Sequence, residues 1–173
     1  ETPAAGAYTA VGLAIASELR GLGIQVNFGP VIDVNNNPDN PVIGVRAFGD
    51  DPEQVAAFGM AYMEGLHAGG VAAVGKHYPG HGDVDLDSHY VLPHSDKQLS
   101  DLEALELVPF QRLIDEGIPG IMSAHITFQH VDPSTAVSAK DGLPIELPAT
   151  LSYVLMTELL REQLGFHGVL FSD

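Results

Sequence analysis

Apolar residues recur along the chain at two spacings, which together predict four helices that each lead into a strand. One apolar residue every three or four positions is typical of a helix with one buried face. We expect Gly23 to end the first helix, and a fourth helix is expected over residues 151–164, ending at Gly165. The apolar face of the first helix is formed by Val11, Ile15, Leu19 and Leu22.

The second and third helices carry signals at their starts. Asp51 is expected to cap the second helix, Pro52 suits its first position, and Gln54 completes a capping box. The segment SDLE, Ser100 to Glu103, is expected to form the capping box of the third helix. Pro109 should kink that helix, because proline removes a backbone hydrogen bond.

Four short apolar segments are predicted to be strands, centred near residues 26, 73, 122 and 170. A strand about every 48 residues, with a helix in between, indicates a parallel sheet. Such a sheet forms either a doubly wound open layer or a (β/α)8 barrel. No G-x-G-x-x-G motif opens a helix, so nucleotide binding has no support. Residues 126–149 are expected to form a long loop.

Polar residues at the strand ends favour the barrel. A barrel builds its active site from the C-terminal ends of several parallel strands and from the loops that follow them. Four units make half of an eight-unit barrel. We therefore expect residues 1–173 to be a single partial domain, the middle of a TIM-like barrel with further barrel units on both sides. The strand ends carry Asn27 and Asp33, Lys76 and His77, Ser123 and His125, and Ser172 and Asp173.

Composition excludes several functions for this 173-residue chain. Its 45% hydrophobic content is typical of a globular protein. A net charge of −16 with seven Lys and Arg argues against nucleic-acid binding, which needs a basic surface. No apolar run is long enough to insert into a membrane. The absence of cysteine excludes disulfides and thiolate metal sites, and leaves the compartment open.

The segment VGKHYPGHGDVDLDSHY holds most of the candidate chemistry. His77 and His81 suggest a metal site, but His residues four apart converge only on a helix, which Pro79 prevents, so we expect no metal and no other cofactor. Asp87 and His89 suggest an acid–base pair, because residues two apart in an extended loop point the same way. Spacing alone leaves a solvated loop with an incidental Asp–His contact as an equal alternative.

The same segment resembles the signature of glycoside hydrolase family 3, in its β-N-acetylglucosaminidase branch. That signature reads K-H-[FIY]-P-G-H-G, four residues, then D-[ST]-H, and every fixed position matches here. Further stretches resemble the family in the same order, so the resemblance covers essentially the whole chain and implies a TIM-like barrel. These stretches are LGIQVNFGPVIDV, IGVRAFGDDPEQVA, MSAHI, PATLS and GFHGVLFSD.

The resemblance implies three catalytic residues. Asp173 matches the nucleophile, which would form a covalent glycosyl-enzyme as in retaining hydrolysis. His89 matches the acid/base, with Asp87 as its partner. A neutral His can stand near an anionic nucleophile without like-charge repulsion and, as imidazolium, can protonate the leaving oxygen.

The resemblance also implies three substrate-binding residues. Arg46, Lys76 and His77 match positions that hold sugar hydroxyls. For Arg46 the alternative is a salt bridge to Asp50 or Asp51.

The activity implied by the resemblance is a retaining β-N-acetylhexosaminidase that acts on terminal N-acetylglucosamine, in peptidoglycan fragments. A β-glucosidase and an N-acetylglucosaminide phosphorylase of the same family are the near alternatives. A metal-dependent hydrolase and a non-catalytic sugar-binding barrel are alternatives from other classes. The family's pocket includes an Asp from an earlier barrel unit. Because the chain lacks that unit, we expect the 173 residues to be inactive by themselves.

Overall fold

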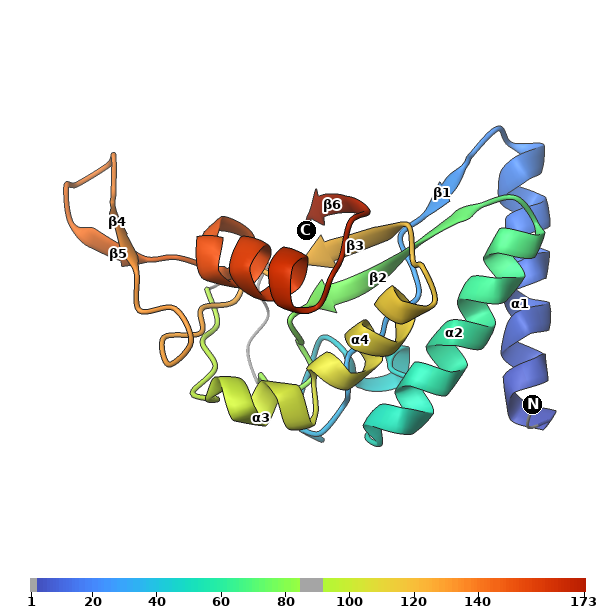
Figure 1. Ribbon diagram of the computed structural model, residues 1–173, viewed down its shortest axis with the longest axis horizontal. Helices are drawn as coiled ribbons and strands as arrows, with labels where there is room; N and C mark the ends of the chain where they lie inside the picture. Colours follow the sequence, from blue (N-terminus) through green and yellow to red (C-terminus); the bar gives the residue numbers. More distant parts are fainter. Residues whose placement is uncertain (1–2, 85–91) are drawn as a thin grey trace.

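The computed structural model describes residues 3–84 and 92–173, in which helices and strands alternate (Figure 1). Its parallel strands are β1 (Val26–Asn27), β2 (Ala72–Tyr78), β3 (Gly120–Ser123) and β6 (Val169–Ser172), and β4 (Thr135–Val137) pairs with β5 (Pro144–Glu146). The helices are α1 (Pro3–Gly21), α2 (Pro52–Ala68), α3 (Leu99–Ala104), α4 (Leu107–Asp115), the 3-10 turns η1 (Gly44–Arg46) and η2 (Ala149–Leu151), and the π-helix η3 (Val154–Gln163).

One parallel sheet organises the chain, with its strands in the order β1-β2-β3-β6. Val26 lies beside Ala72, and Gly120 lies between Val74 and Val169. A helix precedes each strand, so the predicted α/β fold of four helix–strand units is confirmed. All four C-terminal strand ends meet at one edge of the sheet, because the strands run in the same direction.

The sheet is strongly curved. Neighbouring strands lie about 4.8 Å apart, so a flat sheet would separate β1 from β6 by about 14 Å. The ring of Phe28, next to β1, nevertheless lies 5.1 Å from the ring of Phe171 in β6. Residues from all four strands line a hollow of about 80 Å³ inside this curve, among them Val26, Val74, Gly120 and Val169. Barrel strands curve in this way.

Helices α2 and α4 pack on the outer side of the sheet, and α1 packs on α2 (Figure 1). The predicted apolar face of α1 is only partly correct, because Val11 and Leu22 are exposed whereas Gly12 and Ala16 are buried. Small residues let the two helix backbones approach closely. A Cβ atom added at Gly65 of α2 would lie 2.1 Å from the carbonyl oxygen of Thr9.

The start of α2 follows the prediction in part. Asp51 caps the helix by accepting the backbone N–H of Gln54 at 2.8 Å, and Pro52 is its first residue. The side chain of Gln54, however, donates to the carbonyl oxygen of Phe48 at 2.9 Å instead of closing a capping box.

The predicted third helix is two helices. A capping box joins Gln98 and Asp101, two positions before the one expected from Ser100. The chain breaks at Leu105 and restarts as α4, with Pro109 in its first turn, where proline costs no hydrogen bond. Pro109 therefore lies near a helix start, and the expected kink inside one helix is wrong.

The segment predicted to be a long loop contains a hairpin. Strands β4 and β5 pair through Ala136 and Ile145 and project from the body of the molecule (Figure 1).

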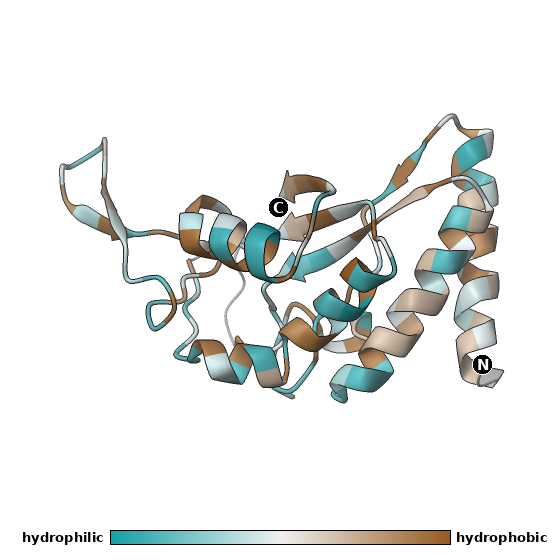
Figure 2. Ribbon diagram, in the orientation of Figure 1, coloured by the Kyte–Doolittle hydropathy of each residue, from teal (hydrophilic) through white to brown (hydrophobic). Residues whose placement is uncertain are grey.

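The first predicted strand is shorter than expected, because β1 ends at Asn27, before Gly29 and Pro30. Hydrophobic residues concentrate in β3 and β6 (Figure 2). In the described residues no helix is long and apolar enough to cross a bilayer.

Candidate active site

The polar ends of β1 and β2 are brought together by continued pairing beyond β1. Val31 bridges to Lys76, and the backbone N–H of Ile32 donates to the carbonyl oxygen of Lys76 at 2.8 Å. This pairing places Asp33 directly beside His77. The register of β2 against β3 shifts between Lys76 and Tyr78, so the strand is irregular where its polar residues begin.

Asp33 is fully buried and accepts three hydrogen bonds. Its Oδ2 lies 2.7 Å from Nδ1 of His77. Its Oδ1 accepts the backbone N–H of His77 at 3.1 Å and that of His81 at 2.8 Å. Burial opposes the charged form, but the interactions with His77 outweigh it and hold the pKa of Asp33 below its ordinary 3.8. The carboxylate is therefore ionised at neutral pH.

Asparagines of the loop after β1 hold the start of the loop after β2. Nδ2 of Asn40 donates to the carbonyl oxygen of His81 at 2.7 Å. Nδ2 of Asn36 donates to the carboxylate of Asp83 at 3.1 Å, and Nδ2 of Asn37 donates to the carbonyl oxygen of Asp83 at 3.0 Å. The described part of this loop is thus fixed on one side by residues 33–40.

Two glycines allow that loop to pack closely. A Cβ atom at Gly82 would lie 1.8 Å from the carbonyl oxygen of Val34. Gly80 has φ +144°, and a Cβ atom there would lie 2.6 Å from Cγ of Glu106. Close packing accounts for both of them.

An ion pair supports the other side of the loop. Nζ of Lys97 bonds Oε1 of the buried Glu106 and lies 3.6 Å from Oδ1 of Asp83. Burial raises the pKa of the Glu106 carboxyl, whereas the bond from Lys97 opposes that rise.

Lys76 and Arg46 form the cationic part of the site. Burial lowers the pKa of the half-buried Lys76, and the charge of Arg46 lowers it further, whereas Asp173 and Asp33 oppose the shift. Arg46 is exposed and donates to the carbonyl oxygen of Val42 at 3.1 Å. Within the described residues it forms no ion pair with Asp50 or Asp51.

Asp173 follows β6 and is exposed at the same edge of the sheet. Its carbonyl oxygen lies 2.8 Å from Nε2 of His125, whose Nδ1 lies 2.8 Å from Oγ1 of Thr150. Thr150 is also 2.9 Å from Oγ of Ser123 at the end of β3. This chain of polar groups links the ends of β3 and β6.

The structure brings together four of the six predicted site residues. Lys76 and His77 are consecutive, and the charges of Arg46 and Asp173 both act on Lys76. His77 is almost completely buried, with 4% of its surface exposed. The other two, Asp87 and His89, lie outside the described residues.

Asp33 is the residue whose importance sequence reasoning missed. It was identified as a polar strand end, but its contact with His77, 44 positions away, depends on how the strands pair. A charged residue inside the apolar run VIDV was the available signal, because a buried charge requires partners.

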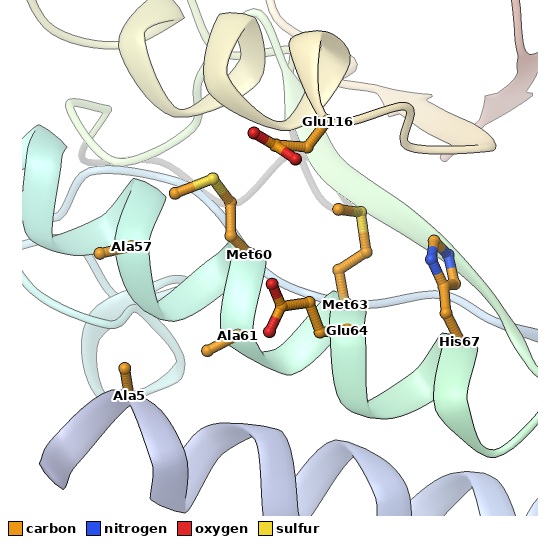
Figure 3. A pocket seen from close by; sticks show the side chains of 8 residues that line it. All are labelled: Ala5, Ala57, Met60, Ala61, Met63, Glu64, His67 and Glu116. Atoms are coloured by element: carbon orange, nitrogen blue, oxygen red, sulfur yellow. The ribbon is translucent and has the colours of Figure 1, made fainter. Parts of the chain in front are cut away.

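A larger groove, of about 330 Å³, lies between the outer helices (Figure 3). Met60, Met63 and His67 of α2 and Ala5 of α1 line it, with Glu116 after α4 (Figure 3). It lies away from the polar strand ends. In the described parts of the chain no three His, Asp or Glu side chains are placed to hold a metal ion.

Comparison with known proteins gives one consistent result. The family model "Glycosyl hydrolase family 3 N terminal domain" matches residues 2–173. Beta-hexosaminidase A of Pseudoalteromonas piscicida is 45% identical over 166 residues, which cover 95% of this chain and 28% of that protein.

Solved structures agree in fold. A glycoside hydrolase family 3 beta-N-acetylglucosaminidase from Paenibacillus sp. superposes with a TM-score of 0.88 at 43% identity, covering 98% of this chain and 31% of that one. NagZ from Neisseria gonorrhoeae in complex with N-trifluoroacetyl-D-glucosamine superposes with a TM-score of 0.85 at 40% identity, covering 98% of this chain and 45% of that one. The beta-glucoside phosphorylase BglX bound to 2FGlc superposes with a TM-score of 0.87 at 29% identity, covering 98% of this chain and 30% of that one.

This chain spans less than half the length of each of these relatives. The family model nevertheless matches almost every residue, and the fold is shared with solved members of that family. The chain therefore belongs to glycosyl hydrolase family 3.

Proposed function

We propose that the protein containing this chain is a retaining β-N-acetylhexosaminidase that hydrolyses terminal N-acetyl-β-D-glucosaminides. The observation that carries the proposal is the 45% identity of nearly the whole chain to a beta-hexosaminidase. The complex of NagZ with N-trifluoroacetyl-D-glucosamine supports the substrate class, because that ligand is an N-acylated glucosamine. Relatives from bacteria favour peptidoglycan fragments as the natural substrate.

In this proposal Asp173 and His89 carry the reaction. The carboxylate of Asp173 attacks the anomeric carbon while His89, oriented by Asp87, protonates the departing glycosidic oxygen. The product of this step is a covalent glycosyl-enzyme. Neutral His89 then takes a proton from water, which displaces Asp173 and releases the sugar with its original configuration.

Lys76, His77 and Arg46 would hold the sugar during both steps. The position of Lys76 and His77 at the end of β2 supports this role, since donors on a rigid sheet fix a polar ring better than donors on a loop. Arg46 lies in the turn η1, and its charge acts on Lys76. We further propose that residues 1–173 are the middle part of a barrel. The curvature that brings Phe28 to Phe171 supports this placement.

Covalent labelling tests the proposal. The full gene product is incubated with a 2-fluoro sugar analogue, which traps the glycosyl-enzyme, and the labelled peptide is mapped by mass spectrometry. We expect the label on Asp173 and hydrolysis of an aryl N-acetyl-β-glucosaminide by the unlabelled protein. A label on another residue would overturn the assignment of the nucleophile.

A phosphorylase is the second candidate, favoured by the 29% identity to the phosphorylase BglX. In that case phosphate would replace water in the second step. Product analysis with and without phosphate separates the two, because only a phosphorylase yields the sugar 1-phosphate.

A further inference from the structure

We infer that Asp33 is a positioning residue that fixes the proton on one ring nitrogen of His77 and anchors the start of the loop after β2. This inference rests on the proposed function, because it concerns a residue assigned to sugar binding. Asp33 itself is fully buried and touches no sugar in this scheme.

The first part of the inference concerns the ring. An ionised carboxylate only accepts hydrogen bonds, so the 2.7 Å contact between Oδ2 of Asp33 and Nδ1 of His77 places the proton on Nδ1. In the neutral ring Nε2 is then an acceptor, to which a sugar hydroxyl can donate a hydrogen bond. The adjacent Lys76 only donates. Consecutive residues of β2 therefore offer one acceptor and one donor.

The second part concerns the backbone. Oδ1 accepts the N–H groups of His77 and His81, which flank the turn at Pro79 and Gly80. One oxygen thus holds the loop and the other orients the ring. Because the two tasks use different oxygens, one substitution can separate them.

In the part of the chain that the structure describes, His77, His81 and Lys76 interact with this carboxylate. The rings of His77 and His81 lie 5.7 Å apart in an edge-on arrangement, and both interact with Asp33. Lys76 also interacts with it, from β2. Removing the charge of Asp33 therefore removes an interaction that favours the charged forms of His81 and Lys76, so activity should change in its pH dependence as well as in its size.

The separating variant is Asp33→Asn in the full gene product. Its Oδ1 can still accept both backbone N–H groups, so the melting temperature should stay near that of the unchanged protein. Its amide N–H₂ would face Nδ1 of His77, which moves the ring proton to Nε2. We expect kcat/KM on an aryl N-acetyl-β-glucosaminide to fall roughly 10- to 100-fold, by analogy with the removal of the hydrogen-bond partner of a metal-binding His.

Nitrogen-15 NMR of histidine-labelled protein follows the proton directly. Nδ1 of His77 should be protonated in the unchanged protein, and the chemical shifts of Nδ1 and Nε2 should exchange in Asp33→Asn. The matched control is Asp132→Asn, a second buried Asp, which accepts hydrogen bonds from Ser134 and Ser152. It should lower stability and leave kcat/KM and its pH profile unchanged.

Two results would overturn the inference: Nε2 protonated in the unchanged protein, or Asp33→Asn with an unchanged pH profile and kcat/KM. Failure of the proposed function is distinguishable, because the unchanged protein would then show no glycosidase activity. In that case the NMR spectra still decide which nitrogen of His77 carries the proton.

Discussion

At the scale of single residues, buried charges hold the candidate site together. Glu106 is 1% exposed and bonds Lys97, which also faces Asp83 of the loop after β2. A buried ion pair adds little net stability, but loss of one partner leaves the other charge without compensation. Lys97 precedes α3 and Glu106 lies between α3 and α4, nine positions later, so no periodic pattern in the sequence indicated the pair.

We predict that Lys97→Met destabilises the protein by on the order of 3 kcal/mol at pH 7. Without Lys97 the pKa of Glu106 rises further above its ordinary 4.5, so the folded protein holds that proton more tightly. The loss should therefore shrink as the pH falls toward 4.5 and grow as it rises. Urea denaturation of the full gene product at several pH values measures it.

The control for that variant is Lys140→Met, because Lys140 is exposed at the turn of the hairpin. This change should leave the free energy of unfolding within about 0.5 kcal/mol of the unchanged value. Equal stability of both variants at pH 7 would argue against the buried pair.

At the scale of elements, short sequence motifs such as helix caps predicted where helices start better than they predicted which helices and strands contact each other. Asp51 and Pro52 define the start of α2 because a cap is made by neighbours in sequence. The closest contact of α1 with α2 depends on Gly12 and Gly65, which no hydrophobic periodicity marks. The β4–β5 hairpin was missed for a related reason. Its residues are largely exposed, so its strands lack the alternation of apolar and polar residues that marks a half-buried strand.

Gly65→Ala should lower the free energy of unfolding by about 1–3 kcal/mol, because the added methyl group meets the backbone of α1 at Thr9. Gly21→Ala is the matched control, since no atom lies within 4 Å of a Cβ atom there. It should leave stability unchanged or raise it by up to about 1 kcal/mol. If chemical denaturation finds the same stability for both variants, the close packing of α1 on α2 is refuted.

At the scale of the whole molecule, the parallel sheet and its polar strand ends were predictable, because one strand recurs with each helix. The contacts that complete the site were not predictable from the sequence. Its described residues come from positions 33 to 173, and their contacts depend on strand register and on the curvature of the sheet. That curvature leaves apolar side chains open on the concave side, including Phe28 at 52% exposure and Val169 at 58%.

We predict that the 173 residues, produced by themselves, do not hydrolyse an aryl N-acetyl-β-glucosaminide, because relatives are more than twice as long. The concave face should bind the dye ANS, which reports exposed apolar surface. Phe28→Ser should weaken dye binding more than Leu22→Ser, a change at an exposed apolar residue that directly follows α1. Turnover by the isolated chain at the rate of the full gene product would contradict this prediction.

The order of the strands in the sheet is their order along the chain, apart from the inserted hairpin. Each strand of this sheet after β1 therefore pairs with a predecessor 45–49 positions earlier. During synthesis on the ribosome, β2, β3 and β6 therefore each emerge after a strand with which they pair. Since domains form from the N-terminal side as the chain emerges, this sheet can grow one helix–strand unit at a time.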